Sequence, residues 1–232
     1  MTKRGFLSVT KRYALINKIY SLMKKELILE FRSHMLVLNI LIFALASNLL
    51  IYYFFNSVTA GLNVYMSVYW IIIIFMIFTG FDNMFRLEHE KKNLNFLVFH
   101  YDVSLVLISK VLFNLLLLLA GQSIFTFIFF IFNDINFERP GLFVLYAFIG
   151  SAVLNISTVC TALISCRARN RFLFFIISAP VMFPLVIALS KTGEILLLDK
   201  ALDLRKIMFM VFYAVFYFML ALLFAEKILI EE

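Results

Sequence analysis

The sequence has little glycine, proline and cysteine, and few charged residues for its length. Among its 232 residues there are 7 Gly, 3 Pro and 2 Cys, and only 15% are charged. The low Gly and Pro content excludes a collagen-like or a disordered chain. Nothing indicates an oxidising compartment or a metal partner for Cys160 and Cys166, so we expect both to be packing residues.

Motifs that carry enzymatic chemistry are also missing. The pattern G-x-x-x-x-G-K-[ST] does not occur, so the chain is not expected to bind ATP phosphates as a P-loop does. Neither H-E-x-x-H nor G-x-S-x-G occurs, and His34, His89 and His100 lack the spacing of a metal site. We therefore expect no catalytic residues, no metal site and no enzymatic activity of the chain by itself.

Apolar residues are abundant instead, and they occur in six long blocks. They make up 64% of the chain, with 29 Phe, whereas a soluble domain is about 45–50% apolar. Blocks of about 20 residues match a hydrocarbon core of about 30 Å at about 1.5 Å per helical residue. The sequence therefore predicts an all-α polytopic membrane protein with six transmembrane helices. The expected spans are 35–55, 64–85, 111–132, 142–165, 172–189 and 207–225.

The basic residues predict the orientation of these spans. Of 21 Lys and Arg residues, 16 fall in segments that would share the side of the N-terminus, and 5 fall on the other side. Since basic residues favour the cytoplasmic side, we expect both termini in the cytoplasm. The net charge of +7 then reflects topology, and no nucleic acid partner is expected. A bacterial inner membrane is the expected location, with an organellar inner membrane as the alternative.

The first 34 residues form a cytoplasmic segment before the transmembrane domain of residues 35–232. A lead of this length is too long for the charged start of a signal peptide, although Ala44-Leu45-Ala46 resembles a cleavage site. Residues 13–32 separate apolar from basic side chains at helical spacing. This pattern predicts an amphipathic helix in the membrane interface, with its basic side toward anionic lipid headgroups.

Two acidic residues interrupt the apolar side of this helix. Glu26 and Glu30 are four residues apart and so share one helical face. Either they pair with Lys18 or Arg32, or they contact a cytoplasmic partner.

Two connections between spans are long enough to hold structure of their own. The cytoplasmic loop 86–110 changes from charged to aromatic and aliphatic residues, and a short helix there would need a partner or a lipid surface to cover it. The outer segment 191–206 carries apolar residues on one helical face and is expected to lie in the outer interface.

Charged residues are absent from the middle third of every expected span. Ion-coupled transport usually needs such residues, so it is disfavoured. Asp82, near the inner end of the second span, either pairs with Arg86 or has a functional role. Asn155 and Thr158 belong to a fourth span rich in small and polar residues, which either permits close helix packing or lines a substrate path.

The fifth span contains two prolines four residues apart, Pro180 and Pro184. Each removes one backbone donor and frees the carbonyl four residues earlier. Within a membrane such carbonyls need neighbouring protein groups or water. We expect this helix to bend and to contact protein there, either as a structural kink or as a gate.

Motifs spread over residues 23 to 193 resemble the CcmB family, the haem exporter protein B of the cytochrome c maturation system. The similarity rests on the order and spacing of short patterns such as ELxxxFR before the first span and PxxxPL in the fifth. The residues that match are Glu26, Leu27, Phe31, Arg32, Asp82, Phe85, Arg86, Glu88, Leu94, Leu97, Lys110, Gly150, Leu154, Arg167, Arg169, Pro180, Pro184 and Leu185.

The resemblance implies an ABC-2-like exporter permease that docks on a separate, CcmA-like ATP-binding subunit. The docking candidates are Glu88, Leu94, Phe96, Leu97, Tyr101, Glu26 and Glu30. It also implies a CcmC-like haem-handling membrane protein, a small CcmD-like membrane subunit and a second copy of the chain as partners. Haem is then the transported or released ligand, and ATP binds the partner subunit. Since Trp70 is the one tryptophan and no histidine is expected on the outer side, we expect no directly bound cofactor.

Two other functions stay open. A permease of the same architecture would export a lipid, a polysaccharide or a drug. A scaffold or a membrane enzyme is disfavoured, because no catalytic constellation is found.

Overall fold

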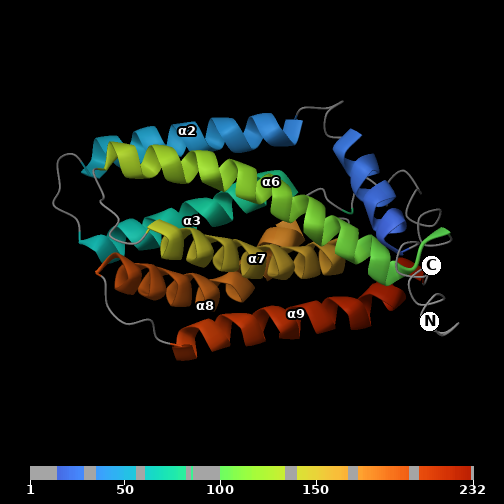
Figure 1. The fold of residues 1–232 in the computed structure, drawn as a ribbon. Coiled ribbons are helices and arrows are strands. Elements are labelled where there is room, and N and C mark those ends of the chain that lie inside the picture. The colour runs from blue at the N-terminus through green and yellow to red at the C-terminus, as the bar shows by residue number, and fades with distance from the viewer. Residues whose placement is uncertain are drawn as a thin grey trace, which may run out of the picture.

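Six long helices form a bundle, and a shorter helix precedes them (Figure 1). The computed structural model describes residues 15–28, 35–55, 61–81, 85, 100–133, 140–166, 172–198 and 204–230. The long helices are α2 (Met35–Phe55), α3 (Leu62–Phe81), α6 (Val103–Phe132), α7 (Pro140–Ser165), α8 (Phe172–Leu197) and α9 (Leu204–Ile230). Residues 15–28 form the short helix, here called the N-terminal helix.

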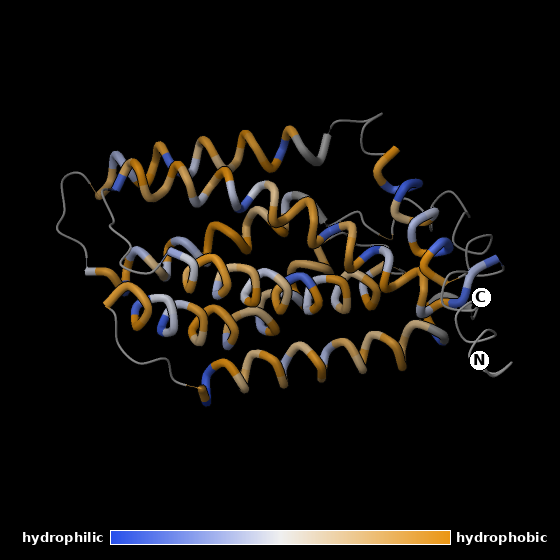
Figure 2. The backbone as a smooth tube through the Cα atoms, in the orientation of Figure 1, coloured by the Kyte–Doolittle hydropathy of each residue, from blue (hydrophilic) through white to orange (hydrophobic). Residues whose placement is uncertain are grey.

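All six long helices are long and apolar enough to cross a membrane, and no strand occurs among the residues that the structure describes. The prediction of an all-α protein with six transmembrane helices is therefore confirmed. Apolar residues predominate along the long helices, with some polar residues between them inside the bundle (Figure 2). A predominantly apolar helix of this length suits a membrane span.

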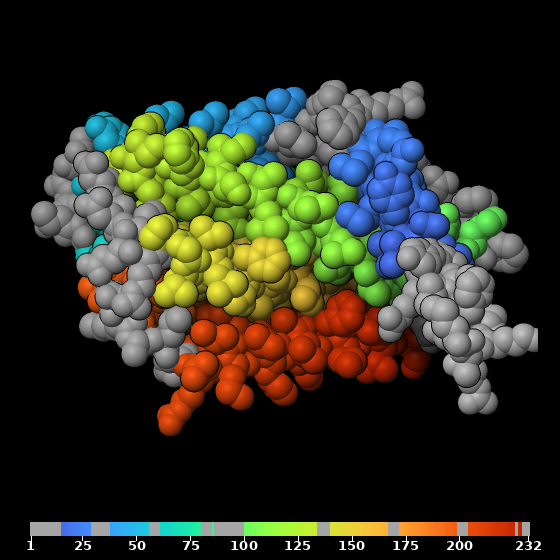
Figure 3. All heavy atoms as spheres, in the orientation of Figure 1, coloured from blue at the N-terminus to red at the C-terminus, as the bar shows by residue number. Residues whose placement is uncertain are grey.

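The long helices stand in two rows of three. Helix α3 lies between α2 and α8 in one row, and α7 lies between α6 and α9 in the other. The rows touch mainly through α2 with α6 and through α7 with α8. The row of α6, α7 and α9 faces the viewer in Figure 3, where the N-terminal helix lies against α6. This arrangement gives α3 and α7 the central positions, and their facing side chains form much of the core.

The helix ends differ from the expected spans at several points. Helix α6 starts at Val103, so the last eight residues of the expected loop 86–110 are its first turns. Helix α8 continues to Leu197, so the first part of the expected outer segment 191–206 belongs to α8. Helix α3 is described from Leu62 to Phe81. The residues between it and Phe85 lie outside the described part, so the predicted end of the second span at Phe85 stays a prediction. The expected spans were bounded by charged residues, but a helix continues past a charge wherever that charge finds a partner or water.

The length of α6 has a direct consequence. Its 30 residues measure about 45 Å at about 1.5 Å per residue, which exceeds a hydrocarbon core of about 30 Å. The first turns of α6 therefore extend beyond the core at the end of the bundle where the N-terminal helix lies (Figure 1).

Candidate functional site

The N-terminal helix packs against the first turns of α6, and we call this contact the N-terminal junction. Leu22, which is 4% exposed, forms a small apolar cluster with Leu105 and Val106 of α6. Ile19 and Tyr101 lie at the edge of the cluster, and the Ser21 hydroxyl is 3.5 Å from the Tyr101 hydroxyl. Leu22 is thus the buried contact of this helix, while Ile16, Tyr20 and Ile28 stay exposed, and its predicted place in the membrane interface stays a prediction.

An ion pair lies next to this cluster. The Lys110 ammonium donates a hydrogen bond to Glu26 Oε1 at 3.2 Å. The Lys110 side chain is only 3% exposed and that of Glu26 18%. Because a buried ammonium is costly without a charged partner, the burial of Lys110 favours the position of the N-terminal helix in which Glu26 lies beside it.

An aromatic ring covers the same ammonium. Phe85 is buried, and its ring centroid lies 5.0 Å from Lys110 Nζ, which is within the range of a cation–π contact. Glu26, Phe85 and Lys110 come from three distant parts of the sequence. All three are residues on which the resemblance to the CcmB family rests, although no contact between them was predicted.

The expected docking residues are only partly placed. Tyr101 is half-buried beside the N-terminal helix. Glu26 pairs with Lys110, a partner that was not predicted, and Arg32, one of its two expected partners, lies outside the described residues. The remaining candidates lie outside the described residues, and their role stays a prediction: Glu30, Glu88, Leu94, Phe96 and Leu97.

Within the membrane, a chain of hydrogen bonds joins α3, α6 and α7. The Tyr69 hydroxyl of α3 lies 2.8 Å from the Thr126 hydroxyl and accepts a bond from the Gln122 amide at 3.0 Å. Ser151 of α7 donates to the Gln122 carbonyl oxygen. The sequence analysis did not single out Gln122, although a glutamine inside an apolar helix is a usable signal for an interhelical bond.

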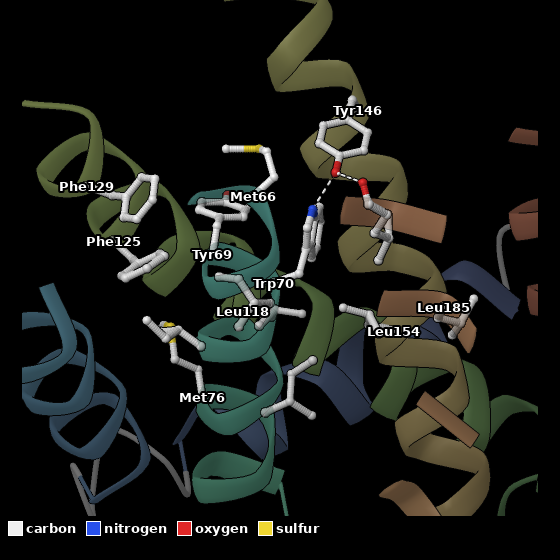
Figure 4. Close-up of a cluster of buried hydrophobic side chains, with 14 of the residues drawn as sticks. Met66, Tyr69, Trp70, Met76, Leu118, Phe125, Phe129, Tyr146, Leu154 and Leu185 are labelled. Carbon is white, nitrogen blue, oxygen red and sulfur yellow. Dashed lines mark hydrogen bonds between the residues drawn. The ribbon is translucent and has the colours of Figure 1, made fainter. Parts of the chain in front are cut away.

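A second connection joins α3, α7 and α8 (Figure 4). The Trp70 indole N–H donates to the Tyr146 hydroxyl, which donates to the Leu189 carbonyl oxygen at 2.5 Å. Gly150 lies directly beneath the Trp70 ring, where a Cβ atom would collide with the ring and with Leu189. Trp70 is therefore a packing residue in this structure, held by polar and steric contacts together.

The intramembrane polar residues predicted from sequence have different surroundings. Thr158 donates to the Leu154 carbonyl of its own helix at 2.7 Å, as a structural residue does. Asn155 donates to the Val111 carbonyl of α6 at 2.8 Å and so joins two helices. Asp82 lies outside the described residues.

The prolines lie inside α8, which continues through Pro180 and Pro184 as one helix. The Tyr213 hydroxyl of α9 donates to the Val181 carbonyl at 2.5 Å. This carbonyl is next to that of Pro180, which Pro184 cannot bond because it has no N–H. Helix α9 thus contacts α8 through a hydrogen bond next to the prolines, whereas the bend of α8 and the partners of the freed carbonyls stay predictions.

The described His, Cys, Asp and Glu residues form no cluster of three that could hold a metal ion. Cys160 and Cys166 are free thiols buried in an apolar cluster. The described residues connect the N-terminal helix to the membrane bundle through the first turns of α6.

Comparison with known families agrees with this reading. The model of the CcmB protein family matches residues 17–228 of the 232. Searches of the curated proteins and of the solved structures found no match. Since the family match spans both the N-terminal helix and all six membrane helices, the chain belongs to the CcmB family of membrane permeases.

Proposed function

We propose that this chain is the membrane subunit of an ATP-driven exporter that releases haem for cytochrome c maturation. The observation that carries the proposal is the family match over residues 17–228, which includes all six apolar helices. The chain itself has no P-loop sequence, so ATP is bound and hydrolysed by a separate subunit.

The ATP-binding subunit docks at the cytoplasmic end of the bundle. The proposed docking residues are Tyr101, Glu30 and the loop residues Glu88, Leu94, Phe96 and Leu97. Tyr101 lies two residues before the start of α6 and contacts the N-terminal helix through Ser21. A subunit docked there would push on two elements that are already joined.

The remaining partners follow from the family. A haem-handling membrane protein and a small membrane subunit complete the complex, and a second copy of the chain faces the first. Helices α2 and α9 expose many large apolar side chains, among them Tyr53, Phe54, Phe212 and Leu223. Lipid or the second copy would cover these faces. We place the complex in an inner membrane with both termini in the cytoplasm.

Proposed roles within the membrane are limited to three places. Pro180 and Pro184 allow α8 to change its bend, and Asn155 holds α7 to α6 during that change. Asp82 is placed by its sequence position near the cytoplasmic end.

Affinity purification of the tagged chain in mild detergent tests this proposal. An ATP-binding subunit and a tryptophan-rich haem-binding membrane protein should co-purify, and the complex should carry haem absorbance. Recovery of an ATP-binding subunit without haem or a haem-handling protein would indicate export of a lipid, a polysaccharide or a drug instead.

A substitution in the loop tests the docking residues. Leu97→Asp should abolish stimulation of the ATPase while the chain still inserts in the membrane, because a carboxylate in a desolvated contact is costly. Asn95→Asp adds the same charge two residues away and should have a smaller effect. Equal recovery of the ATP-binding subunit with both variants and the unchanged chain would show that Leu97 is not in the docking surface.

A further inference from the structure

We propose that Glu26 and Lys110 are positioning residues that fix the N-terminal helix to α6, so that the two helices move as one unit. The ion pair sets the relative position of the two helices, and the apolar cluster beside it stabilises their contact. The use of this unit in transport rests on the proposed function, but the positioning itself does not.

The two contacts of the N-terminal helix have matching spacing. Leu22 meets Leu105 and Val106, and Glu26 meets Lys110. Four residues separate the contacts on one helix, and four or five on the other, which is about 6–8 Å at about 1.5 Å per residue. Both contacts therefore form together only when the two helices run in the same general direction, and Figure 1 shows the N-terminal helix crossing the start of α6 obliquely.

An apolar cluster alone does not determine this register. Apolar contacts are non-directional, so Leu22 could slide or rotate over Leu105 and Val106 at little cost. The Lys110 ammonium is 3% exposed, and few positions of the N-terminal helix bring a carboxylate to it. The ion pair thus selects one position among those that the apolar cluster permits.

The next residue carries the constraint into the membrane. Asn155 of α7 donates to the carbonyl of Val111, directly after Lys110. Further along α6, Gln122 joins it to α3 and α7. A displacement of the N-terminal helix therefore enters α6 at Lys110 and reaches α7 within one residue of that point.

Spin-label distance measurements on the full chain test the positioning. One nitroxide replaces Lys24 on the exposed side of the N-terminal helix, and the other replaces Leu116, an exposed residue of α6. The two native cysteines are buried and stay in place. With Glu26 and Lys110 unchanged, the two nitroxides should give one narrow distance distribution.

Three variants separate the ion pair from general packing. Lys110→Met keeps the length of the side chain and removes its charge, and Glu26→Gln leaves the buried ammonium without that carboxylate. Both should broaden or shift the distribution, and the charge exchange Glu26→Lys with Lys110→Glu should narrow it again. If only the sizes of the two side chains mattered, the charge exchange would not be expected to restore the narrow distribution.

Lys25→Met is the matched control. Lys25 also lies 3.6 Å from Glu26, but its side chain is 35% exposed, and exposed pairs contribute little. This variant should leave the distribution narrow. The proposal would be overturned if both single variants kept a narrow distance distribution. It would also be overturned if the charge exchange left the distribution as broad or as shifted as the single variants do.

ATPase measurements on the assembled complex separate this inference from the proposed function. If the single variants broaden the distribution and also lower ATPase stimulation, the unit transmits movement. If they broaden the distribution while stimulation stays unchanged, the positioning stands and the coupling role of this helix in the proposed function is wrong.

Discussion

A few glycine positions determine how closely the helices approach one another. Gly150 of α7 lies against the buried Trp70 ring, and the Trp70 indole is held by its bond to Tyr146. Neither ring has room to move, because both are almost fully buried. The small residue at 150 therefore permits the contact between α3 and α7.

Gly150→Ala should destabilise the folded chain by about 1–3 kcal/mol, the usual cost of overpacking. The added methyl group would collide with Trp70 and Leu189, and neither can withdraw. Gly141→Ala in the same helix is the control, because no atom lies within 4 Å of its added methyl group. Unfolding in detergent by SDS titration measures both, and equal stability of the two variants would show that Trp70 accommodates the change.

The pairing of Glu26 with Lys110 could not have been predicted from either residue alone. The sequence placed Glu26 on an apolar helix face and suggested partners within about one or two turns, because only local neighbours follow from helical spacing. Its partner is 84 residues away. The usable signal was that Glu26, Phe85 and Lys110 all belong to the patterns that resemble the CcmB family.

The six helices were predictable because the signal for a membrane span is strong. A block of about 20 apolar residues has few other stable states in a bilayer, where backbone groups must bond within the helix. The helix ends were less predictable, because hydropathy locates the hydrocarbon core and not the point where a helix stops. Val103–Lys110 and Lys191–Leu197 both continue a helix past a charged residue.

Polar contacts between helices were also hidden from the sequence. Residues such as Gln122 and Tyr69 reveal a capacity for hydrogen bonds but not the identity of the partner. Of the expected intramembrane residues, Asn155 does join two helices and Thr158 does not. The distinction depends on the rotation of α7 about its axis, which packing determines.

Gln122→Leu should weaken the association of α3, α6 and α7 by about 1–2 kcal/mol, since hydrogen bonds between membrane helices contribute about 0.6 kcal/mol each on average. The variant removes the bonds of Gln122 to Tyr69 and Ser151. Ser123→Ala is the control, because Ser123 is exposed and its hydroxyl donates to the Leu119 carbonyl of its own helix. SDS titration measures the stability of both variants. Equal stability of Gln122→Leu and Ser123→Ala would contradict this account.

The orientation of the bundle follows from the distribution of charge over the entire chain. Single cysteines at Lys24 and at Leu198, both exposed in the structure, should report opposite sides of the membrane. In spheroplasts, a membrane-impermeant maleimide should label Leu198→Cys at once and Lys24→Cys only after permeabilisation. The reverse order would place the N-terminal junction outside the cell, where an ATP-binding subunit could not dock.

The whole molecule is a membrane bundle with the N-terminal helix fixed against α6 at one end. Hydrogen bonds and close packing join α6 to α7 and α3. We propose that movement applied at α6 is passed on to these two helices and that its energy comes from ATP hydrolysis by a partner subunit.

The most direct measurement uses vesicles that contain the chain with or without its purified ATP-binding subunit and haem-handling partner. ATP hydrolysis and capture of haem by an acceptor protein outside the vesicles are followed together. The account predicts that the chain alone hydrolyses no ATP, and that haem capture in the complete complex requires both ATP and this chain. Hydrolysis by the isolated chain, or haem capture at the same rate without it, would contradict the account.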